Sequence, residues 1–102
     1  MSGRAGPGHL DIFVVDPEGA MQHVEWNGAV WRPLHPNFET ISEGIVFHSE
    51  PESASWGANR IDVFCLDSNN HLRTKFQEGG NWQPGQLGWF DLGGGPAGRF
   101  RF

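Results

Sequence analysis

The chain repeats itself at a constant offset of 51 residues. Residues 9–31 (HLDIFVVDPEGAMQHVEWNGAVW) overlay residues 60–82 (RIDVFCLDSNNHLRTKFQEGGNW) without a gap. Identical pairs at this offset include Asp11 and Asp62, Phe13 and Phe64, Asp16 and Asp67, Gly28 and Gly79, Trp31 and Trp82, Pro33 and Pro84, and Gly6 and Gly57. A repeat of about 40 to 50 residues is typical of solenoids, arrays and propellers. The 102 residues therefore hold two such units.

Composition favours short strands and turns over helices. The chain has eight Phe, five Trp, 15 Gly and 7 Pro, which together indicate an all-β fold. A single cysteine, Cys65, excludes an internal disulfide, and its place in the middle of an apolar strand predicts a buried small side chain. At this length the chain is one small domain, and its buried surface is modest.

Charge and hydropathy narrow the range of partners. The net charge of -5 argues against nucleic acid and against anionic membranes, because both require a cationic surface. There is no run long enough to insert into a membrane and no secretory pattern at the start of the sequence. We therefore expect a protein that is cytoplasmic or released without a signal peptide.

Turn signals divide each unit into strands. Residues 1–8 are rich in glycine and are expected to form a flexible N-terminal arm, and the first unit then covers residues 9–51. Its strands are expected at 9–15, 20–26 and 30–34, separated by the DPEG turn and the NG hairpin signal. The second unit, 52–94, repeats these strands at 60–66, 71–77 and from 81 onward, and adds one at 52–57. Three strands are thus expected in the first unit and four in the second.

The alternation within the strands predicts burial on both faces. In RIDVFCL, residues 60–66, apolar side chains occur on both sides of the strand. Sheets that pack face to face around an axis, as the blades of a β-propeller do, require this pattern. Two blades cannot close a ring, so we expect identical chains to associate head to tail. Residues 95–102 would complete a blade of a neighbouring chain. A trimer with six blades is favoured, and a tetramer with eight is the alternative.

Three motifs carry a resemblance to a known family. SWGANRIDVF (55–64), HVEWNGAVW (23–31) and WFDLGG (89–94) resemble the repeat of the PLL-like β-propeller lectins. The resemblance implies a carbohydrate-binding propeller that holds fucose or an O-methylated sugar in pockets between blades. Its partners would be glycans or glycoconjugates, fucosylated ones above all, bound by a multivalent homo-oligomer.

Candidate sugar-binding residues combine aromatic rings with planar polar groups, because a ring covers the C–H face of a sugar and a fork of donors or acceptors takes its hydroxyls. The candidates are Glu25, Trp26, Asn27, Trp31, Trp56, Asn59, Arg60 and Trp82, with His23 added by the resemblance. Trp31 and Trp82 are either structural blade residues or ligand platforms. Arg60 is either a ligand or the ion-pair partner of a strand aspartate. Asp11 and Asp62 are expected to be buried and hydrogen-bonded, for instance to backbone amides of a neighbouring blade.

The sequence predicts no metal, no cofactor and no catalytic role. The DPEG and DSNN segments are interpreted as turns that begin with aspartate, and the five histidines have no ligand spacing. No nucleophile elbow or phosphate loop occurs. Two alternatives to a lectin remain open: a propeller scaffold that binds protein, and a hydrolase or lyase with clustered acids in a central tunnel. Buried tryptophans and mutually satisfied polar groups would argue against the lectin.

Overall fold

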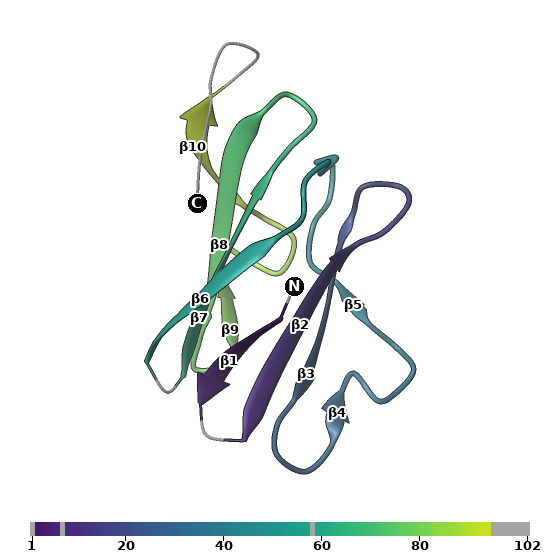
Figure 1. The fold of residues 1–102 in the computed structure, drawn as a ribbon, viewed down its shortest axis with the longest axis vertical. Coiled ribbons are helices and arrows are strands. Elements are labelled where there is room, and N and C mark those ends of the chain that lie inside the picture. The colour runs from purple at the N-terminus through teal and green to yellow at the C-terminus, as the bar shows by residue number, and fades with distance from the viewer. Residues whose placement is uncertain (1, 7, 58, 95–102) are drawn as a thin grey trace.

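The chain folds into two antiparallel sheets with no helix in the part that the structure describes (Figure 1). A computed structural model describes residues 2–6, 8–57 and 59–94. The first sheet contains β1 (Ser2–Gly6), β2 (His9–Val15), β3 (Met21–Trp26), β4 (Trp31–Arg32) and β5 (Glu39–Thr40). The second contains β6 (Glu52–Gly57), β7 (Arg60–Leu66), β8 (His71–Glu78), β9 (Asn81–Gln83) and β10 (Phe90–Gly94). The all-β prediction is confirmed.

Both sheets have the same topology. The first runs β1-β2-β3, and the outer edge of β3 pairs with both β4 and β5. The second runs β6-β7-β8, and the outer edge of β8 pairs with both β9 and β10. Each sheet is therefore a meander of four strands, in which the last strand is interrupted. No helix long and apolar enough to cross a membrane occurs in the described ranges.

The sequence repeat extends to the pairing register. Cross-strand partners in the first sheet recur 51 residues later as cross-strand partners in the second. The equivalent pairs are Asp11–Glu25 and Asp62–Phe76, Gly3–Asp11 and Ala54–Asp62, and His23–Glu39 and Thr74–Phe90. Even the irregularity between the first two strands recurs, since the register shifts after Gly3 and after Ala54. The two sheets are copies of one folding unit.

The N-terminal segment differs from its prediction. Residues 1–8 lack strand-forming side chains, yet Ser2–Gly6 forms β1, which pairs with β2 and lies against β6 and β7. Pairing with β2 and packing on the second sheet stabilise the strand, although its residue types have low strand propensity. The first unit consequently has the same strands as the second, so no strand is missing from it. The predicted C-terminal strand at 95–102 lies outside the described residues.

The turns follow their predicted chemistry. Asp16 accepts hydrogen bonds at Oδ1 from the backbone amides of Glu18 and Ala20 (3.0 and 2.9 Å). Asp67 accepts equivalent bonds from Asn69 and His71 (2.8 and 3.0 Å). In both units an aspartate side chain thus folds the chain back after the second strand, which confirms the interpretation of these segments as Asp-initiated turns.

The core lies between the facing surfaces of the two sheets. The first sheet contributes Phe13 and Met21, and the second contributes Ile61, Val63 and Cys65, all of them fully buried. The remaining core side chains come from the connecting segments and β9: Ile41, Phe47, Trp82 and Trp89. The burial predicted for Cys65 is confirmed.

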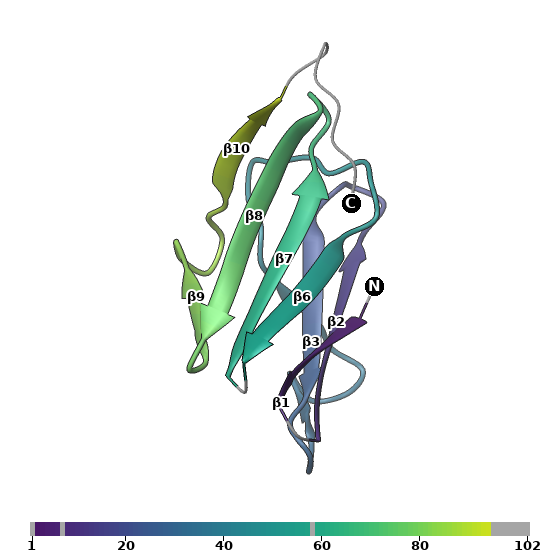
Figure 2. The ribbon, with the colours of Figure 1, turned by 60° about the vertical axis from the view of Figure 1, so that its left-hand side comes forward.

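The sheets converge at their first strands. Across the two sheets, β1 lies against β6 and β7, and no other inter-sheet pair of described strands comes as close. Figure 2 shows β2 and β3 behind β6 and β7, whereas β9 and β10 stand at the opposite edge. The space between the sheets therefore widens toward the outer strands.

Candidate functional site

A groove occupies this wider space between the outer strands of the two sheets. Its volume is about 480 Å³, and both repeats line it. The lining residues are Glu25, Trp31, Arg32, Pro33, Leu34 and Glu39 from the first unit, and Gln77, Gly80, Trp82 and Gln86 from the second. This volume falls within the usual range of small-ligand sites.

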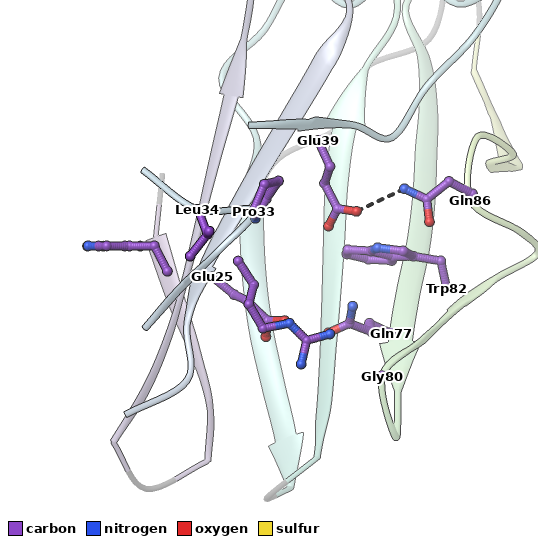
Figure 3. A pocket seen from close by; sticks show the side chains of 10 residues that line it. Glu25, Pro33, Leu34, Glu39, Gln77, Gly80, Trp82 and Gln86 are labelled. Carbon is purple, nitrogen blue, oxygen red and sulfur yellow. Dashed lines mark hydrogen bonds and ion pairs between the residues drawn. The ribbon is translucent and has the colours of Figure 1, made fainter. Parts of the chain in front are cut away.

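Trp82 forms one wall of the groove (Figure 3). Glu39 and Gln86 lie on one side of its ring and Gln77 on the other. Gln86 donates a hydrogen bond from Nε2 to Glu39 Oε1 (3.0 Å), which ties the loop after β9 to β5 across the groove. The Trp82 side chain is only 7% exposed, so it is a wall and not an open stacking platform.

On its buried side, Glu39 is hydrogen-bonded to His23, which in turn contacts Asp11. The ring of His23 is fully buried, with Nε2 2.7 Å from Asp11 Oδ1 and Nδ1 2.5 Å from Glu39 Oε2. Burial opposes the imidazolium, but the hydrogen bonds to both carboxylates outweigh it and raise the pKa of His23. Phe13 stacks on the ring, with centroids 4.8 Å apart, and Trp82 meets it edge-on at 5.2 Å.

Glu39 is kept ionised by the same contacts. Burial on its own would raise the pKa of Glu39, but hydrogen bonds from His23 and Gln86 lower it below the ordinary value. The groove therefore presents a fixed carboxylate whose charge is balanced within the protein. Such a group can accept hydrogen bonds from a bound hydroxyl.

Lys75 lies behind the tryptophans in the core. Its side chain is fully buried, and Nζ donates to the backbone carbonyls of Ile41 (2.8 Å) and Gln86 (2.6 Å). Nζ is also 5.0 Å from the centroid of the Trp82 ring and 5.3 Å from that of Trp89. Desolvation lowers the pKa of Lys75 to about 8. This ammonium group joins the segment after β5 to the loop that carries Gln86.

A smaller cavity of about 140 Å³ shares part of the groove's lining. His9, Asn27 and Asn59 line it together with Glu25, Arg32, Gln77, Gly79 and Gly80. Asn27 uses its Oδ1 to accept from Ala29 and Val30 at the hairpin turn (both 2.9 Å). Within the described residues, no hydrogen bond engages the side-chain amide of Asn59 or Gln77.

Five of the nine candidates from the sequence meet around these two cavities: Glu25, Asn27, Trp31, Asn59 and Trp82. The other candidates do not. His23 is buried beneath the groove and cannot touch a ligand directly. Trp26 packs against Trp31, with centroids 5.3 Å apart, without lining either cavity. The side chain of Trp56 lies outside the described part of the chain.

Arg60 is an ion-pair partner and not a groove residue. It donates from Nε and Nη2 to the two oxygens of Asp62 (both 3.1 Å), and its guanidinium lies 3.8 Å from the centroid of the Phe76 ring. Asp11 and Asp62 are buried as expected, but their observed partners are the side chains of His23 and Arg60, where backbone amides of a neighbouring blade were expected.

Sequence reasoning missed four polar groove residues, Arg32, Glu39, Gln77 and Gln86, and also Pro33, Leu34 and Gly80. Gln77 occupies the position of Trp26 in the repeat, so the offset could have drawn attention to it. Glu39 and Gln86 lie in or after short outer strands, where no periodic pattern marks them.

The fold and the groove define a class: an all-β protein of two repeated four-stranded meanders with a cleft between the repeats. No family model, no curated protein and no solved structure matches this chain.

Proposed function

We propose that this chain is a non-catalytic carbohydrate-binding protein that holds fucose, or a related O-methylated sugar, between its two repeats. One observation carries the proposal. The groove joins an aromatic wall to planar polar side chains, and both repeats supply the lining. Sites for neutral sugars need this pairing of apolar surface with directed hydrogen-bonding groups.

Each part of the groove has a role in recognition. Trp31 is partly exposed and lines the groove, while the buried Trp82 shapes the wall. Gln77 offers both a donor and an acceptor, and Arg32 offers a fork of donors. Glu39 accepts, since its charge is already held by His23. One such pocket corresponds to a Kd on the order of 1 mM to 1 μM.

A glycan array followed by titration of the best sugar tests the proposal. Gln77→Ala and Trp31→Ala should each weaken binding by roughly tenfold or more, because each removes a contact of about 1–2 kcal/mol. Asn69→Ala is the control, since Asn69 is an exposed amide in the turn after β7, and neither it nor its repeat equivalent Glu18 lines the groove or the smaller cavity. No bound glycan, or equal loss in the control, would reject the site. Release of reducing sugar would instead identify a hydrolase.

Multivalency would come from head-to-tail assembly of chains as propeller blades. The face of the second sheet that packs on the first contains Cys65, which is fully buried. Its repeat equivalent, Val14, lies on the outer face of the first sheet and is 40% exposed. Likewise Ile41 is fully buried between the sheets, while its equivalent Leu92 is 52% exposed on the second sheet. The outer face of the first sheet is thus equivalent, in the repeat, to the packed face of the second sheet. The outer face of the second sheet is likewise equivalent to the packed face of the first.

This equivalence supports a second copy of the chain as the occupant of both outer faces. In this arrangement the second sheet of one chain would pack on the first sheet of the next, in the same way as the two sheets pack within one chain. Each contact between chains would be heterologous, and a series of such contacts would close into a ring. The two sheets lie closer together at β1 and β6 than at their outer strands. Blades arranged around an axis need this wedge shape to close into a ring. We favour three chains and six blades, with the sugar groove described above between the two blades of each chain.

A protein-binding scaffold is the second candidate. The burial of Trp82 and Trp89 and the pairing of Glu39 with His23 and Gln86 reduce the surface left for a sugar. An array without a bound glycan, together with an intact ring, would favour this function.

A further inference from the structure

We propose that His9, Asp11 and Glu25 form a binding site for one divalent transition-metal ion, with Zn²⁺ as the fitting ion. His9 and Asp11 are two residues apart on β2 and point to the same face, and Glu25 is the cross-strand partner of Asp11 on β3. His9 Nε2, one oxygen of Asp11 and one of Glu25 all lie within 4.8 Å of one another.

Two atoms of this cluster are buried without a hydrogen-bond partner among the described residues: Asp11 Oδ2 and His9 Nε2. Asp11 is fully buried, so an orphaned oxygen there is costly. Oδ2 faces His9 Nε2 at 3.6 Å, which is beyond hydrogen-bonding distance. His9 Nε2 is 2.5 Å from Glu25 Oε2, but the contact is poorly aligned for a ring N–H donor. A cation bound by all three residues would satisfy both orphaned atoms.

The second repeat shows how the same position is neutralised by protein alone. The equivalents of His9, Asp11 and Glu25 are Arg60, Asp62 and Phe76. There the guanidinium bonds both oxygens of Asp62 and lies over the Phe76 ring. In the first repeat the shorter histidine leaves one aspartate oxygen unbonded, and a second carboxylate replaces the phenylalanine. The first repeat therefore has two possible metal ligands, His9 and Glu25, where the second has an arginine and a phenylalanine.

The donor set fits Zn²⁺ better than Ca²⁺ or Mg²⁺. One imidazole nitrogen and two carboxylates are ordinary zinc ligands, whereas the other two ions prefer oxygen alone. Asp11 is already oriented, because His23 binds its Oδ1 and leaves Oδ2 directed at the site. Bonds of about 2.0–2.2 Å require His9 and Glu25 to separate to roughly 3 Å, a small side-chain rotation. His9 and Glu25 also line the smaller cavity, which leaves room for a water molecule as fourth ligand.

The test is titration of the tag-free 102-residue protein with ZnCl₂ alone after treatment with a chelator. Calorimetry should report one ion per chain, and CoCl₂ should give the absorption bands of a four-coordinate Co²⁺ site. His9→Gln and Glu25→Gln should each weaken binding by roughly tenfold or more. His71→Gln is the matched control, because His71 also pairs with a strand carboxylate, Asp91 (2.9 Å), at an exposed position.

Binding of one ion that is lost in both ligand variants and kept in the control supports the site. Absence of binding, or binding that survives His9→Gln and Glu25→Gln, overturns it. Equal loss in His71→Gln overturns it as well, since the ion would then bind histidines at large. Circular dichroism of each variant checks that the sheets are intact. The experiment contains no sugar, so its result is independent of the proposed lectin function.

Discussion

At the scale of single residues, buried ionisable side chains tie separate segments of the chain together. His23 joins a carboxylate of its own strand pair to one on β5, and Lys75 joins two connecting segments through their carbonyls. Both cations are surrounded by aromatic rings from the core, which exclude water and strengthen each contact. The polar groups beneath the groove are thereby fixed in position before any ligand binds.

Lys75, the one lysine in the sequence, should make stability rise with pH above about pH 8. Its folded pKa of about 8 lies below its ordinary value of 10.5. In this window the unfolded chain retains a proton that the folded chain has lost, so the free energy of unfolding increases with pH. The gain between pH 8 and pH 9 should be roughly 1 kcal/mol by urea denaturation, and Lys75→Met should abolish it.

The pH range in which stability should rise ends at about pH 9, because above that pH the thiol of Cys65 lowers the free energy of unfolding. Burial raises the pKa of this thiol above its ordinary value of 9.0, so stability is lost as pH rises beyond that value. An identical slope in wild type and Lys75→Met below pH 9 would contradict the role given to the lysine.

Gly19 should not tolerate a side chain. Its φ is +87°, and an added Cβ would lie 2.6 Å from Val46 Cγ1 and 3.2 Å from Val46 Cα. Gly19→Ala should lower the free energy of unfolding by about 3 kcal/mol, measured by urea denaturation. Gly44→Ala is the control, since Gly44 has φ +73° but open space around it, and it should cost only about 1 kcal/mol. Equal costs would remove the steric part of this explanation.

At the scale of elements, each meander needs a partner sheet to be stable. The strands alternate as the sequence predicts, but one face of each sheet is covered only because the other repeat packs on it. β1 links the two sheets, since it pairs with β2 and lies against β6 and β7. A glycine-rich segment is thus ordered by its neighbours rather than by its own propensity.

Removal of residues 2–6 should destabilise the whole chain. The truncated protein loses the ladder to β2 and the contact with the second sheet, so we expect a decrease of about 1–3 kcal/mol in the free energy of unfolding. Urea denaturation followed by tryptophan fluorescence measures it. An unchanged midpoint would mean that the segment behaves as the free arm that its composition suggests.

At the scale of the whole molecule, the two uncovered faces are the feature that remains to be explained. An isolated pair of sheets leaves Val14 and Leu92 exposed, although their repeat equivalents are buried. The proposed head-to-tail ring would cover both faces with one type of contact. It would also repeat the proposed sugar site around the assembly, so that avidity would multiply a weak single-site affinity.

Val14→Asp should therefore prevent the proposed ring from forming. Light scattering of the wild type should give three times the 11.3 kDa mass of one chain, and the variant should be monomeric, because a charge would be buried at the contact. Val30→Asp is the matched control, since Val30 is exposed at the hairpin turn beside β4. A well-folded wild-type monomer would contradict the assembly.

The sequence by itself determined the repeat, the all-β class and the turns at Asp16 and Asp67, because these depend on local periodicity and short-range hydrogen bonding. Only the tertiary structure decided that Ser2–Gly6 is a strand and that Arg60 pairs with Asp62 instead of lining the groove. It also decided that Glu39 and Gln86 meet across the groove. These outcomes depend on contacts between residues far apart in the chain, so they arise only when the two sheets pack against each other.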